Sequence, residues 1–394
     1  MKKLLIHDYA GHPFQFDLSR ELSKKYQVLH CFNGSNDTPK GKTKKIEGDL
    51  DTFNISPIVL SQKIDKTSFV KRWFQEFTYG IKLVKVIHNY KPDIILSTNT
   101  PLEAQFMLLI YSKIKNVKHI FWLQDMIAFS ASVILKKRNK VLGKFIGGYF
   151  SFLEKIIARF SNNTIVTMES HIAIVENWKV KKERIALINN WAALDDTPVK
   201  DKENNWSKKY QYNDKFVFMW TGTMGLKHSP EHFINLSNHF SKIDNVKIVV
   251  VSESDGAKWL KQKKEELAIE NLDILPYQDF KDVPDMMATA DCLICLVSND
   301  LADAAIPSKF LSYMCAKRSI ILAIKDTNHA AKIAKKFNTA LLCNPEDVDQ
   351  LISHASKLYD NPELRLDIGS SAREYAENNF VISKISKKFE EVFQ

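Results

Sequence analysis

The amino-acid sequence predicts an α/β fold built from two doubly wound domains. Apolar, β-branched runs alternate with helix-like stretches twice along the chain, and one polar segment separates the two series. The runs are almost continuously apolar, which is typical of parallel strands covered by helices on both faces. The chain has 394 residues, a length that suits two or three domains.

The first series of strand-like runs predicts an N-terminal domain over residues 1–194. Its six runs are Lys2–His7, Gln27–Phe32, Asp93–Thr98, His119–Gln124, Thr164–Met168 and Ile185–Asn189. The alternation then stops in Asp195–Trp206, a polar segment that has no apolar period. We interpret this segment as the region of the linker between the domains.

The alternation restarts after the polar segment and predicts a second domain over residues 207–377. Its six runs are Lys215–Trp220, Val246–Ser252, Leu272–Leu275, Asp291–Val297, Ser319–Ile324 and Ala340–Cys343. The end of the chain, Val381–Phe393, has the pattern of an amphipathic helix. Open α/β sheets bind ligands at the carboxyl ends of their strands. Two Rossmann-like domains in tandem therefore predict a ligand site in a shared central cleft.

The composition argues against several classes of protein. Hydrophobic residues make up 45% of the chain, enough for real cores. No segment reaches the ~18 uninterrupted apolar residues of a membrane span. The first residues, MKKLLIHDY, have too short an apolar stretch for a secretory signal, so we expect a cytoplasmic protein.

The cysteines predict neither disulfides nor a metal centre. Their number is odd and their spacing is scattered: Cys31, Cys292, Cys295, Cys315 and Cys343. Cys292 and Cys295 lie three apart in a strand-like run and would point to opposite faces of a sheet, so they cannot jointly bind a metal. We interpret this pair as core residues and expect no metal site.

The charge is divided unequally between the two halves of the chain. The net charge is +10, but residues 1–192 hold 30 basic and 16 acidic residues, whereas the remainder holds 26 and 30. Such an asymmetry indicates a charged partner for the first half. Nucleic acid, an anionic membrane and a phosphorylated substrate are all candidates.

The junction after the first run of the second domain has the features of a phosphate site. Gly222 and Gly225 lie between the run and a helix that we expect Ser229 to cap, with Pro230 at the first helical position. A glycine loop before a helix N-terminus presents backbone N–H groups to a phosphate, and Lys227 adds a positive charge. The alternative is an ordinary strand–helix turn that needs glycine for its backbone angles.

A second candidate anion site opens another helix of the same domain. Pro307, Ser308 and Lys309 begin a predicted helix that runs to about Ala316, and Ser308 can cap it. A lysine at a helix start opposes the helix macrodipole, which indicates that an anion also binds there. The alternative is a solvated lysine without a ligand.

Two polar sites lie at the predicted ligand-binding edge of the first domain. Gln124 and Asp125 follow an apolar strand and are expected to face the cleft. The loop His7–Phe14, with Gly11 and His12, follows the first strand and lies at the same edge. His12 could contact substrate, although a structural or exposed histidine is an equal alternative.

The segment Ala131–Phe160 is basic and amphipathic. Large side chains recur at helical spacing at Phe145, Tyr149, Leu153, Ile156 and Phe160. The segment also carries Lys136, Lys137, Arg138, Lys140, Lys144, Lys155 and Arg159 against one acid, Glu154. This pattern favours a helix at a membrane interface, and the alternative is a core-facing helix with a solvated basic face.

Together these motifs resemble the retaining nucleotide-sugar glycosyltransferases of family 4. That family has the GT-B fold, in which two doubly wound Rossmann-like domains face a central cleft, and the resemblance covers essentially the whole chain. The likeness is strongest to a branch of bacterial surface-polysaccharide enzymes. It rests on four motifs in the expected order, Gly11–Phe14, Gln124–Asp125, Asn190–Trp191 and Pro307–Lys309.

The resemblance implies a role for each candidate residue. Asp125, Lys227 and Lys309 would be catalytic, and Gly11 and His12 would belong to the acceptor-side first loop. The donor-binding residues that it implies are Gly222, Thr223, Gly225, Tyr277, Gln278, Pro307, Ser308 and Ser312. Tyr277 and Gln278 would line the nucleobase.

The chain also departs from the family pattern. Many relatives carry two glutamates eight positions apart, near the donor sugar and the ribose, and those places hold Ala304 and Ser312 here. The ribose contact must then be made differently. The resemblance further implies that the final helix, residues 378–394, crosses back to the N-terminal domain.

The expected reaction is transfer of a sugar from a UDP-linked donor to a lipid-linked saccharide at the cytoplasmic face of an anionic membrane. No cofactor or metal is implied, because lysines can neutralise the leaving diphosphate. One alternative is a nucleotide-sugar 2-epimerase of the same fold. The other is a basic nucleic-acid-binding protein, but no recognised nucleic-acid motif accompanies the charge.

Overall fold

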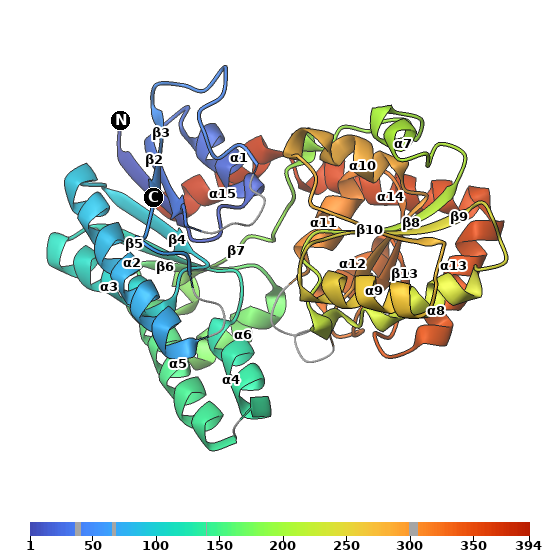
Figure 1. The fold of residues 1–394 in the computed structure, drawn as a ribbon. Coiled ribbons are helices and arrows are strands. Elements are labelled where there is room, and N and C mark those ends of the chain that lie inside the picture. The colour runs from blue at the N-terminus through green and yellow to red at the C-terminus, as the bar shows by residue number, and fades with distance from the viewer. Residues whose placement is uncertain (36–40, 65–67, 139, 299–305) are drawn as a thin grey trace. The chain divides into compact units, whose positions relative to one another are not determined.

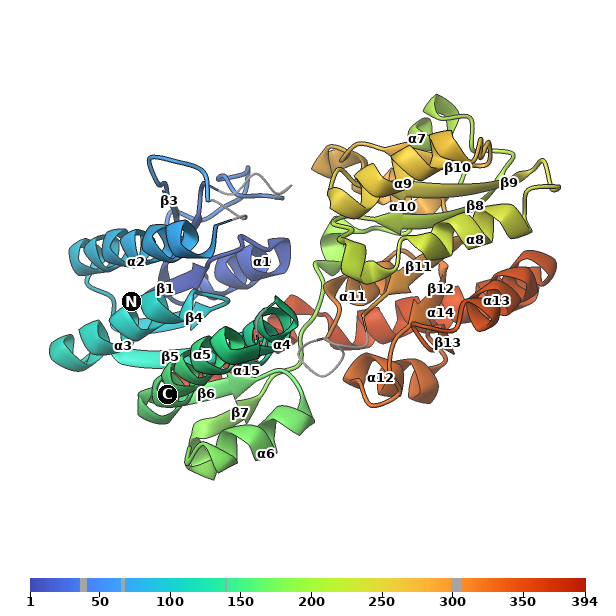
Figure 2. The ribbon, with the colours of Figure 1, turned by 60° about the horizontal axis from the view of Figure 1, so that its bottom comes forward.

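The computed structural model describes residues 1–35, 41–64, 68–138, 140–298 and 306–394. The chain forms two compact units, and each is described by itself (Figures 1 and 2). Unit 1 comprises Met1–Asn190 together with Ile382–Gln394, and unit 2 comprises Trp191–Val381. Each unit is a parallel β-sheet covered by helices, as the sequence predicts.

The sheet of unit 1 has seven parallel strands in the order β3-β2-β1-β4-β5-β6-β7. Their bounds are β1 (Lys3–Asp8), β2 (Gln27–Asn33), β3 (Phe53–Ile58), β4 (Ile94–Thr98), β5 (Lys118–Leu123), β6 (Asn163–Val166) and β7 (Ile185–Leu187). The sequence analysis missed β3. This strand lies at the edge of the sheet, where a polar sequence containing Pro57 is tolerated because only one side of the strand is paired.

The helices of unit 1 pack on this sheet, whose central strands are buried. They are α1 (Pro13–Leu22), α2 (Phe69–Tyr90), α3 (Leu102–Lys115), α4 (Ile127–Arg138), α5 (Lys140–Phe160), α6 (Glu169–Asn177) and α15 (Ile382–Phe393), with a 3-10 turn η1 (Lys182–Arg184). Among the described residues, no helix is both long and apolar enough to cross a bilayer.

The C-terminal helix α15 completes unit 1 rather than unit 2. Its Phe389 ring lies 4.8 Å from the ring of Trp122 in β5, centroid to centroid. The exposed Lys25 also forms a 2.7 Å ion pair with Glu390 of this helix. Because Trp122 and Phe389 are both fully buried, α15 contributes to the hydrophobic core of unit 1.

The sheet of unit 2 has six parallel strands in the order β10-β9-β8-β11-β12-β13. Their bounds are β8 (Phe216–Thr221), β9 (Val246–Val251), β10 (Leu272–Leu275), β11 (Cys292–Leu296), β12 (Ser319–Ala323) and β13 (Leu341–Cys343). Each of the six predicted runs overlaps one of these strands, and only β8 extends beyond its run, by one residue. The change in strand order lies between β8 and β11, where a doubly wound sheet opens its ligand-binding edge.

Unit 2 surrounds its sheet with helices that mostly follow the strands in the predicted alternation. They are α7 (Asn205–Lys209), α8 (Glu231–His239), α9 (Asp255–Glu266), α10 (Val283–Thr289), α11 (Ser308–Cys315), α12 (His329–Phe337), α13 (Val348–Asp360) and α14 (Pro362–Asn379). Short 3-10 turns occur at η2 (Leu194–Asp196), η3 (Leu226–His228) and η4 (Phe280–Asp282). All five cysteines of the protein are free and buried, and burial raises the pKa of each thiol to about 12.

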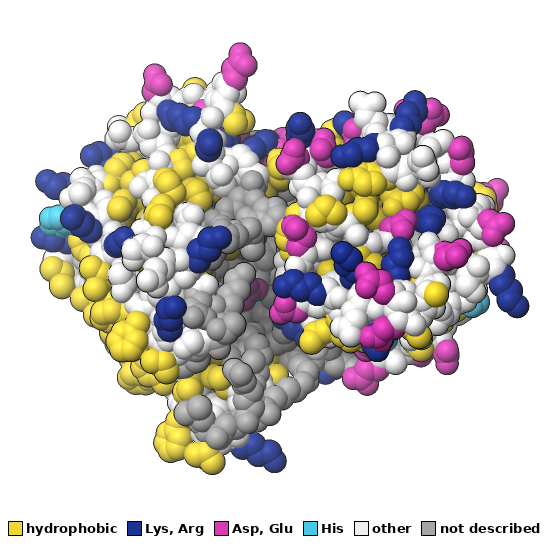
Figure 3. All heavy atoms as spheres, in the orientation of Figure 1, with side chains coloured by type: hydrophobic (Ala, Val, Ile, Leu, Met, Phe, Trp, Pro, Cys, Tyr) yellow, Lys and Arg dark blue, Asp and Glu magenta, His cyan; other side chains and the backbone are white. Residues whose placement is uncertain are grey.

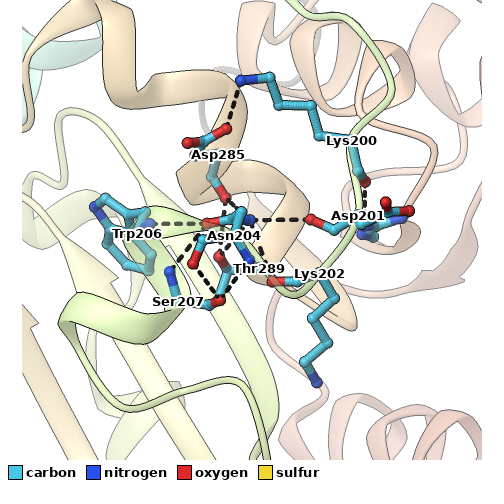
Figure 4. Close-up of polar contacts among 9 residues, drawn as sticks. Lys200, Asp201, Lys202, Asn204, Trp206, Ser207, Asp285 and Thr289 are labelled. Carbon is cyan, nitrogen blue, oxygen red and sulfur yellow. Dashed lines mark hydrogen bonds and ion pairs between the residues drawn. The ribbon is translucent and has the colours of Figure 1, made fainter.

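The polar segment Asp195–Trp206 belongs to unit 2 and is held in place by side-chain hydrogen bonds (Figure 4). The Asn204 side-chain oxygen accepts from the backbone N–H groups of Trp206 (2.9 Å) and Ser207 (3.0 Å), which caps α7. Its amide nitrogen donates to the carbonyl oxygen of Asp285 at 3.0 Å. The lack of an apolar period therefore reflects a polar strap on the surface of unit 2.

Charged residues hold the same strap at further points. Lys200 forms a 2.6 Å ion pair with Asp285 of α10, and its carbonyl oxygen accepts from the Arg318 guanidinium at 2.8 Å. Lys202 pairs with Asp291, which directly precedes β11. These contacts tie the strap to two elements of the unit 2 core.

Candidate active site

The first part of the candidate site is the loop that follows β8 in unit 2. Gly222 has a positive φ of 89°, and its N–H donates to the carbonyl oxygen of Val251 at 2.9 Å. A Cβ atom added here would also lie 3.3 Å from Cε of Lys309. Both the backbone angle and this close approach explain why glycine occupies the position.

Lys309 comes from the start of α11 and lies over this loop. Its ammonium group donates to the carbonyl oxygen of Thr223 at 3.1 Å and lies 4.8 Å from the centroid of the Trp220 ring. The structure thus brings together Lys309 and the glycine loop, which are almost ninety residues apart in sequence. Burial, with a further contribution from Lys227, lowers the pKa of Lys309.

Positive charge gathers at this edge. Burial, Lys309 and Lys227 lower the pKa of His228 to about 4, so its imidazole is neutral at pH 7. The Nδ1 atom of that imidazole accepts from the backbone N–H of Gly225 at 2.9 Å. His228 therefore supports the loop while the two lysines supply charge.

Two helix caps predicted from the sequence are wrong. Ser229 ends η3 in the left-handed region (φ 50°), and α8 begins at Glu231 after Pro230 without a side-chain cap. The 3-10 turn before α8 occupies the place expected for the cap. At α11, Pro307 is the extended N-cap residue and Ser308 is already helical, so its hydroxyl does not cap the helix.

The remaining donor-side candidates fall into two groups. The Tyr277 hydroxyl lies 3.4 Å from the Thr223 hydroxyl, so this tyrosine belongs to the same loop cluster. The Gln278 side-chain oxygen instead accepts from Trp206 Nε1 (3.0 Å) and the Tyr210 hydroxyl (3.1 Å). Gln278 is therefore engaged in holding the loop after β10, a role that the sequence analysis did not predict.

Ala304 and Ser312 occupy the positions of the two family glutamates, and the structure describes only Ser312. Ser312 is half-buried in α11, one turn after Ser308 at the helix start. Ala304 lies outside the described residues.

In unit 1, the first loop is organised by a carboxylate that the sequence analysis missed. Asp8 ends β1 with a fully buried side chain and accepts from the backbone N–H groups of Ala10 (3.0 Å) and His12. Its carboxylate also lies 3.3 Å from Nδ1 of His12. Gly11 adopts a positive φ of 73° in this turn. An acid at the end of an otherwise apolar strand was the signal available in the sequence.

His12 and Asp125 interact electrostatically. Burial alone would lower the pKa of His12, but the Asp8 carboxylate and, to a smaller extent, Asp125 raise it above its ordinary value. Asp125 is exposed, whereas Gln124 is buried and accepts from the Asn99 amide at 2.7 Å. Asp125 is thus open to solvent and Gln124 is held by Asn99, while the expectation that both residues face the cleft stays a prediction.

A second buried carboxylate, Glu154 of α5, supports the turn that carries Asp125. Its Oε1 accepts from the backbone N–H groups of Ile127 (3.0 Å) and Ala128 (3.5 Å), the first residues of α4. Burial raises the pKa of Glu154 to about 7, and the nearby Asp125 charge adds to this increase. The sequence showed Glu154 only as the single acid in a basic segment.

The predicted stripe on α5 divides between two environments. Phe145, Tyr149 and Phe160 are exposed, whereas Leu153 is buried and Ile156 is half-buried. The helix therefore packs one face on the core and leaves aromatic side chains on the other. Lys136, Lys137 and Arg138 have side chains outside the described part of the structure.

Among the described residues, no group of three or more His, Cys, Asp or Glu side chains is arranged to hold a metal ion. Each unit therefore has its own group of candidate residues at its strand-end edge. The group in unit 2 combines lysines with a glycine loop, and the group in unit 1 combines Asp8, His12 and Asp125.

The fold and a family match define the class of the protein. Two parallel-sheet α/β units of this kind form the GT-B fold, which the chain shares with solved glycosyltransferase structures. Residues 201–375, within unit 2, match the family model described as "Glycosyl transferases group 1". The class is therefore a glycosyltransferase with the GT-B fold.

Three individual proteins are similar to the chain. WcaI of Escherichia coli (strain K12), whose name describes a glycosyl transferase of colanic acid biosynthesis, is 19% identical over 311 residues, which cover 76% of this chain and 73% of WcaI. HepE of Anabaena, solved with UDP and glucose, has a TM-score of 0.70 at 14% identity, covering 100% of this chain and 99% of HepE. Sucrose-phosphate synthase of Thermosynechococcus elongatus has a TM-score of 0.74 at 14% identity, covering 100% and 98%.

Proposed function

We propose that the protein is a retaining glycosyltransferase of family 4 that moves a hexosyl or N-acetylhexosaminyl group from a UDP-sugar to a lipid-linked saccharide during surface-polysaccharide synthesis. The observation that carries this proposal is the approach of Lys309 to the Gly222–Thr223 loop at the strand-order change of unit 2. The names of two similar proteins support it, since one binds UDP and the other belongs to colanic acid biosynthesis.

The proposed donor site holds the diphosphate between Lys309, Lys227 and the start of α11. The first N–H groups of a helix lack acceptors within the helix and favour anions. The bond from Lys309 to the Thr223 carbonyl oxygen keeps the ammonium beside the loop until a phosphate oxygen replaces that acceptor. Negative charge grows on the diphosphate as the sugar bond breaks, so preorganised cations stabilise the transition state more than the ground state.

The proposed sugar and acceptor residues lie in unit 1. Asp125 is the exposed carboxylate beside the first loop, and His12 beside it carries a raised pKa. A protonated His12 would help to hold Asp125 in its charged form. Asp8 then acts as the positioning residue that holds His12 by backbone and side-chain hydrogen bonds.

The acceptor is proposed to be membrane-bound because α5 presents aromatic and basic side chains to solvent. Phe145 is 74% exposed and Phe152 is 60% exposed, while Lys140 and Lys144 on the same helix are exposed. Large exposed aromatic surfaces with cations are typical of interfacial helices. We place the enzyme on the cytoplasmic face of an anionic membrane, where nucleotide-sugars are available.

Thermal stabilisation of the purified chain by nucleotides tests the donor assignment. We expect UDP and UDP-sugars to raise the melting temperature, and GDP to do so less, because only the favoured ligand binds the native state tightly. Incubation with UDP-sugar alone then separates transfer from epimerisation, since an epimerase turns over without acceptor. No stabilisation by any nucleoside diphosphate would contradict the proposed function.

A further inference from the structure

Unit 1 contains an apolar groove whose walls are α2 and α5. The groove has a volume of about 470 Å³, and its lining includes Val70, Trp73 and Phe74 of α2 and Phe145, Ile146 and Tyr149 of α5. Hydrophobic side chains gather along the edge of unit 1 where α2 and α5 lie (Figure 3). The sequence analysis identified only α5, because the second wall comes from a distant part of the chain.

The two walls rest on the same helix, α3, which contacts both α2 and α5. Glu103 of α3 accepts from Trp73 Nε1 at 2.6 Å and is only 6% exposed. Burial and then the charge of the same carboxylate raise the pKa of Tyr149 in the other wall. Because one helix supports both walls and its buried carboxylate bonds Trp73 and lies near Tyr149, the groove is preformed.

Close packing of α2 on α3 supports the same conclusion. A Cβ atom added at Gly80 of α2 would lie 3.0 Å from Cα of Ala104 in α3. The two helices therefore already touch at backbone level, and α2 cannot move inward to fill the groove. The walls stay apolar and open to solvent, with Val70 63% exposed and Phe74 59% exposed.

The charges around the groove favour an anionic partner. Lys71 of α2 and Lys144 of α5 are exposed beside lining residues. Between Met126 and Met168 the sequence contains one acid, Glu154, and its side chain is buried. A second copy of this chain would bring like charges together, whereas an anionic lipid offers both a hydrocarbon chain and a negative headgroup.

We propose that the groove between α2 and α5 binds one hydrocarbon chain of an anionic membrane lipid, whose phosphate lies near Lys71 and Lys144. The inference rests on the membrane location in the proposed function and makes it more specific. Membrane attachment through scattered surface residues would need no such groove. A groove with fixed walls instead predicts a saturable site with a stoichiometry of one.

Titration calorimetry with monomeric lysophosphatidylglycerol, below its critical micelle concentration, tests the site. We expect one lipid bound per chain and at least tenfold weaker binding of lysophosphatidylcholine. We also expect at least tenfold weaker binding of lysophosphatidylglycerol to Ile146→Trp, which fills the groove with a larger side chain without adding charge. Phe152→Trp is the matched control, because Phe152 is exposed on the same helix but does not line the groove. The circular dichroism and melting temperature of both variants establish that they are folded.

Equal binding to wild type and a folded Ile146→Trp would overturn the proposal, as would the absence of saturation. Dimerisation of the wild type that Ile146→Trp abolishes would identify a second copy as the occupant and also overturn it. UDP binding is measured on the same samples. If the wild type did not bind UDP, the proposed transferase activity would be contradicted while the lipid result would stand. The two failures are therefore distinguishable.

Discussion

The two units share one architecture but place their polar groups differently. In unit 2 the strand-end edge carries Lys227 and Lys309, and the sheet beneath it is apolar. In unit 1 the strand ends are lined by Asp8 and Asp125, and four histidines are fully buried beneath them, His7, His30, His119 and His171. The same doubly wound sheet therefore carries a cationic edge in one unit and a core with buried histidines in the other.

This difference indicates how the proposed reaction is divided. A leaving diphosphate requires fixed positive charge, which the lysines of unit 2 supply. In the proposed reaction Asp125 of unit 1 is the carboxylate that receives the proton of the acceptor hydroxyl. Variants in the two units should consequently fail in different ways.

The largest effect is expected for the lysines of unit 2. Lys309→Ala and Lys227→Ala should each lower kcat by about 10²–10³, because each removes a preorganised cation from the transition state. Steady-state kinetics with donor and acceptor provide the measurement, with Lys332→Ala, an exposed lysine of α12, as the matched control. A rise in KM at constant kcat would show that the lysines only bind the donor.

The matching test in unit 1 is Asp125→Asn. We expect kcat to fall by about 10², the lower end of the range for losing a proton-transfer group, while UDP affinity stays within twofold. Kinetics and calorimetry on the same preparation separate these two quantities. A variant that keeps the wild-type kcat would make Asp125 a structural residue and remove the proposed division between the units.

A third difference between the units is acid sensitivity. Burial lowers the pKa of His7 and His119 to about 3 and of His30 to about 4, so these folded histidines stay neutral. The unfolded chain takes up protons below about pH 6.5, so unit 1 loses stability as the pH falls from 6.5 towards 3–4. Between pH 7 and pH 5 each of these three histidines should lower the free energy of unfolding by about 2 kcal/mol.

In unit 2, burial and the charges of Lys309 and Lys227 lower the pKa of His228, which lies in a surface loop, to about 4. Hydrogen exchange at pH 5 and pH 7, corrected for intrinsic rates, should therefore show a larger loss of protection in β1 and β4 than in β8 and β9. An equal loss of protection in both units would contradict the greater acid sensitivity of unit 1. The contacts of His7 with Tyr79 (2.7 Å) and Thr100 (2.8 Å) identify the network to monitor.

The smallest effect is expected at Glu154, where the sign is opposite. The folded pKa is raised to about 7, so the stability contributed by the neutral acid is present below about pH 4.5 and is lost as the pH rises through 7. Glu154→Gln keeps an acceptor for the N–H groups of Ile127 and Ala128 without the buried charge. In denaturant titrations we expect the gain in the free energy of unfolding of Glu154→Gln over the wild type to be larger at pH 8 than at pH 5, by on the order of 1–3 kcal/mol. If this gain were the same at pH 5 and pH 8, Glu154 would not be protonated near neutral pH.

The fold was largely predictable from the sequence because buried parallel strands are continuous apolar runs. The edge strand β3 was missed because Asn54, Ser56 and Pro57 break that pattern at a position where one side is unpaired. The polar strap was read as the linker region for a related reason. Its order comes from Asn204 and Lys200 contacts with distant residues, which no local pattern shows.

The candidate site was predictable only in part. The glycine loop could be found because two glycines lie between a strand-like run and a helix, and Lys309 could be found because a cation at a helix start opposes the helix dipole. Asp8 and Glu154 were missed because their function depends on which backbone N–H groups face them after folding. The engagement of Gln278 with Trp206 likewise depends on tertiary contact.

The central claim is that unit 2 recognises a diphosphate through Lys309 and its loop, and comparison of UDP with uridine tests it most directly. Calorimetry on the wild type should give at least tenfold tighter binding of UDP than of uridine. In Lys309→Ala this difference should shrink, because uridine lacks the group that the lysine contacts, while uridine affinity stays the same. Equal affinity of the wild type for UDP and uridine, or an unchanged difference in Lys309→Ala, would contradict the account.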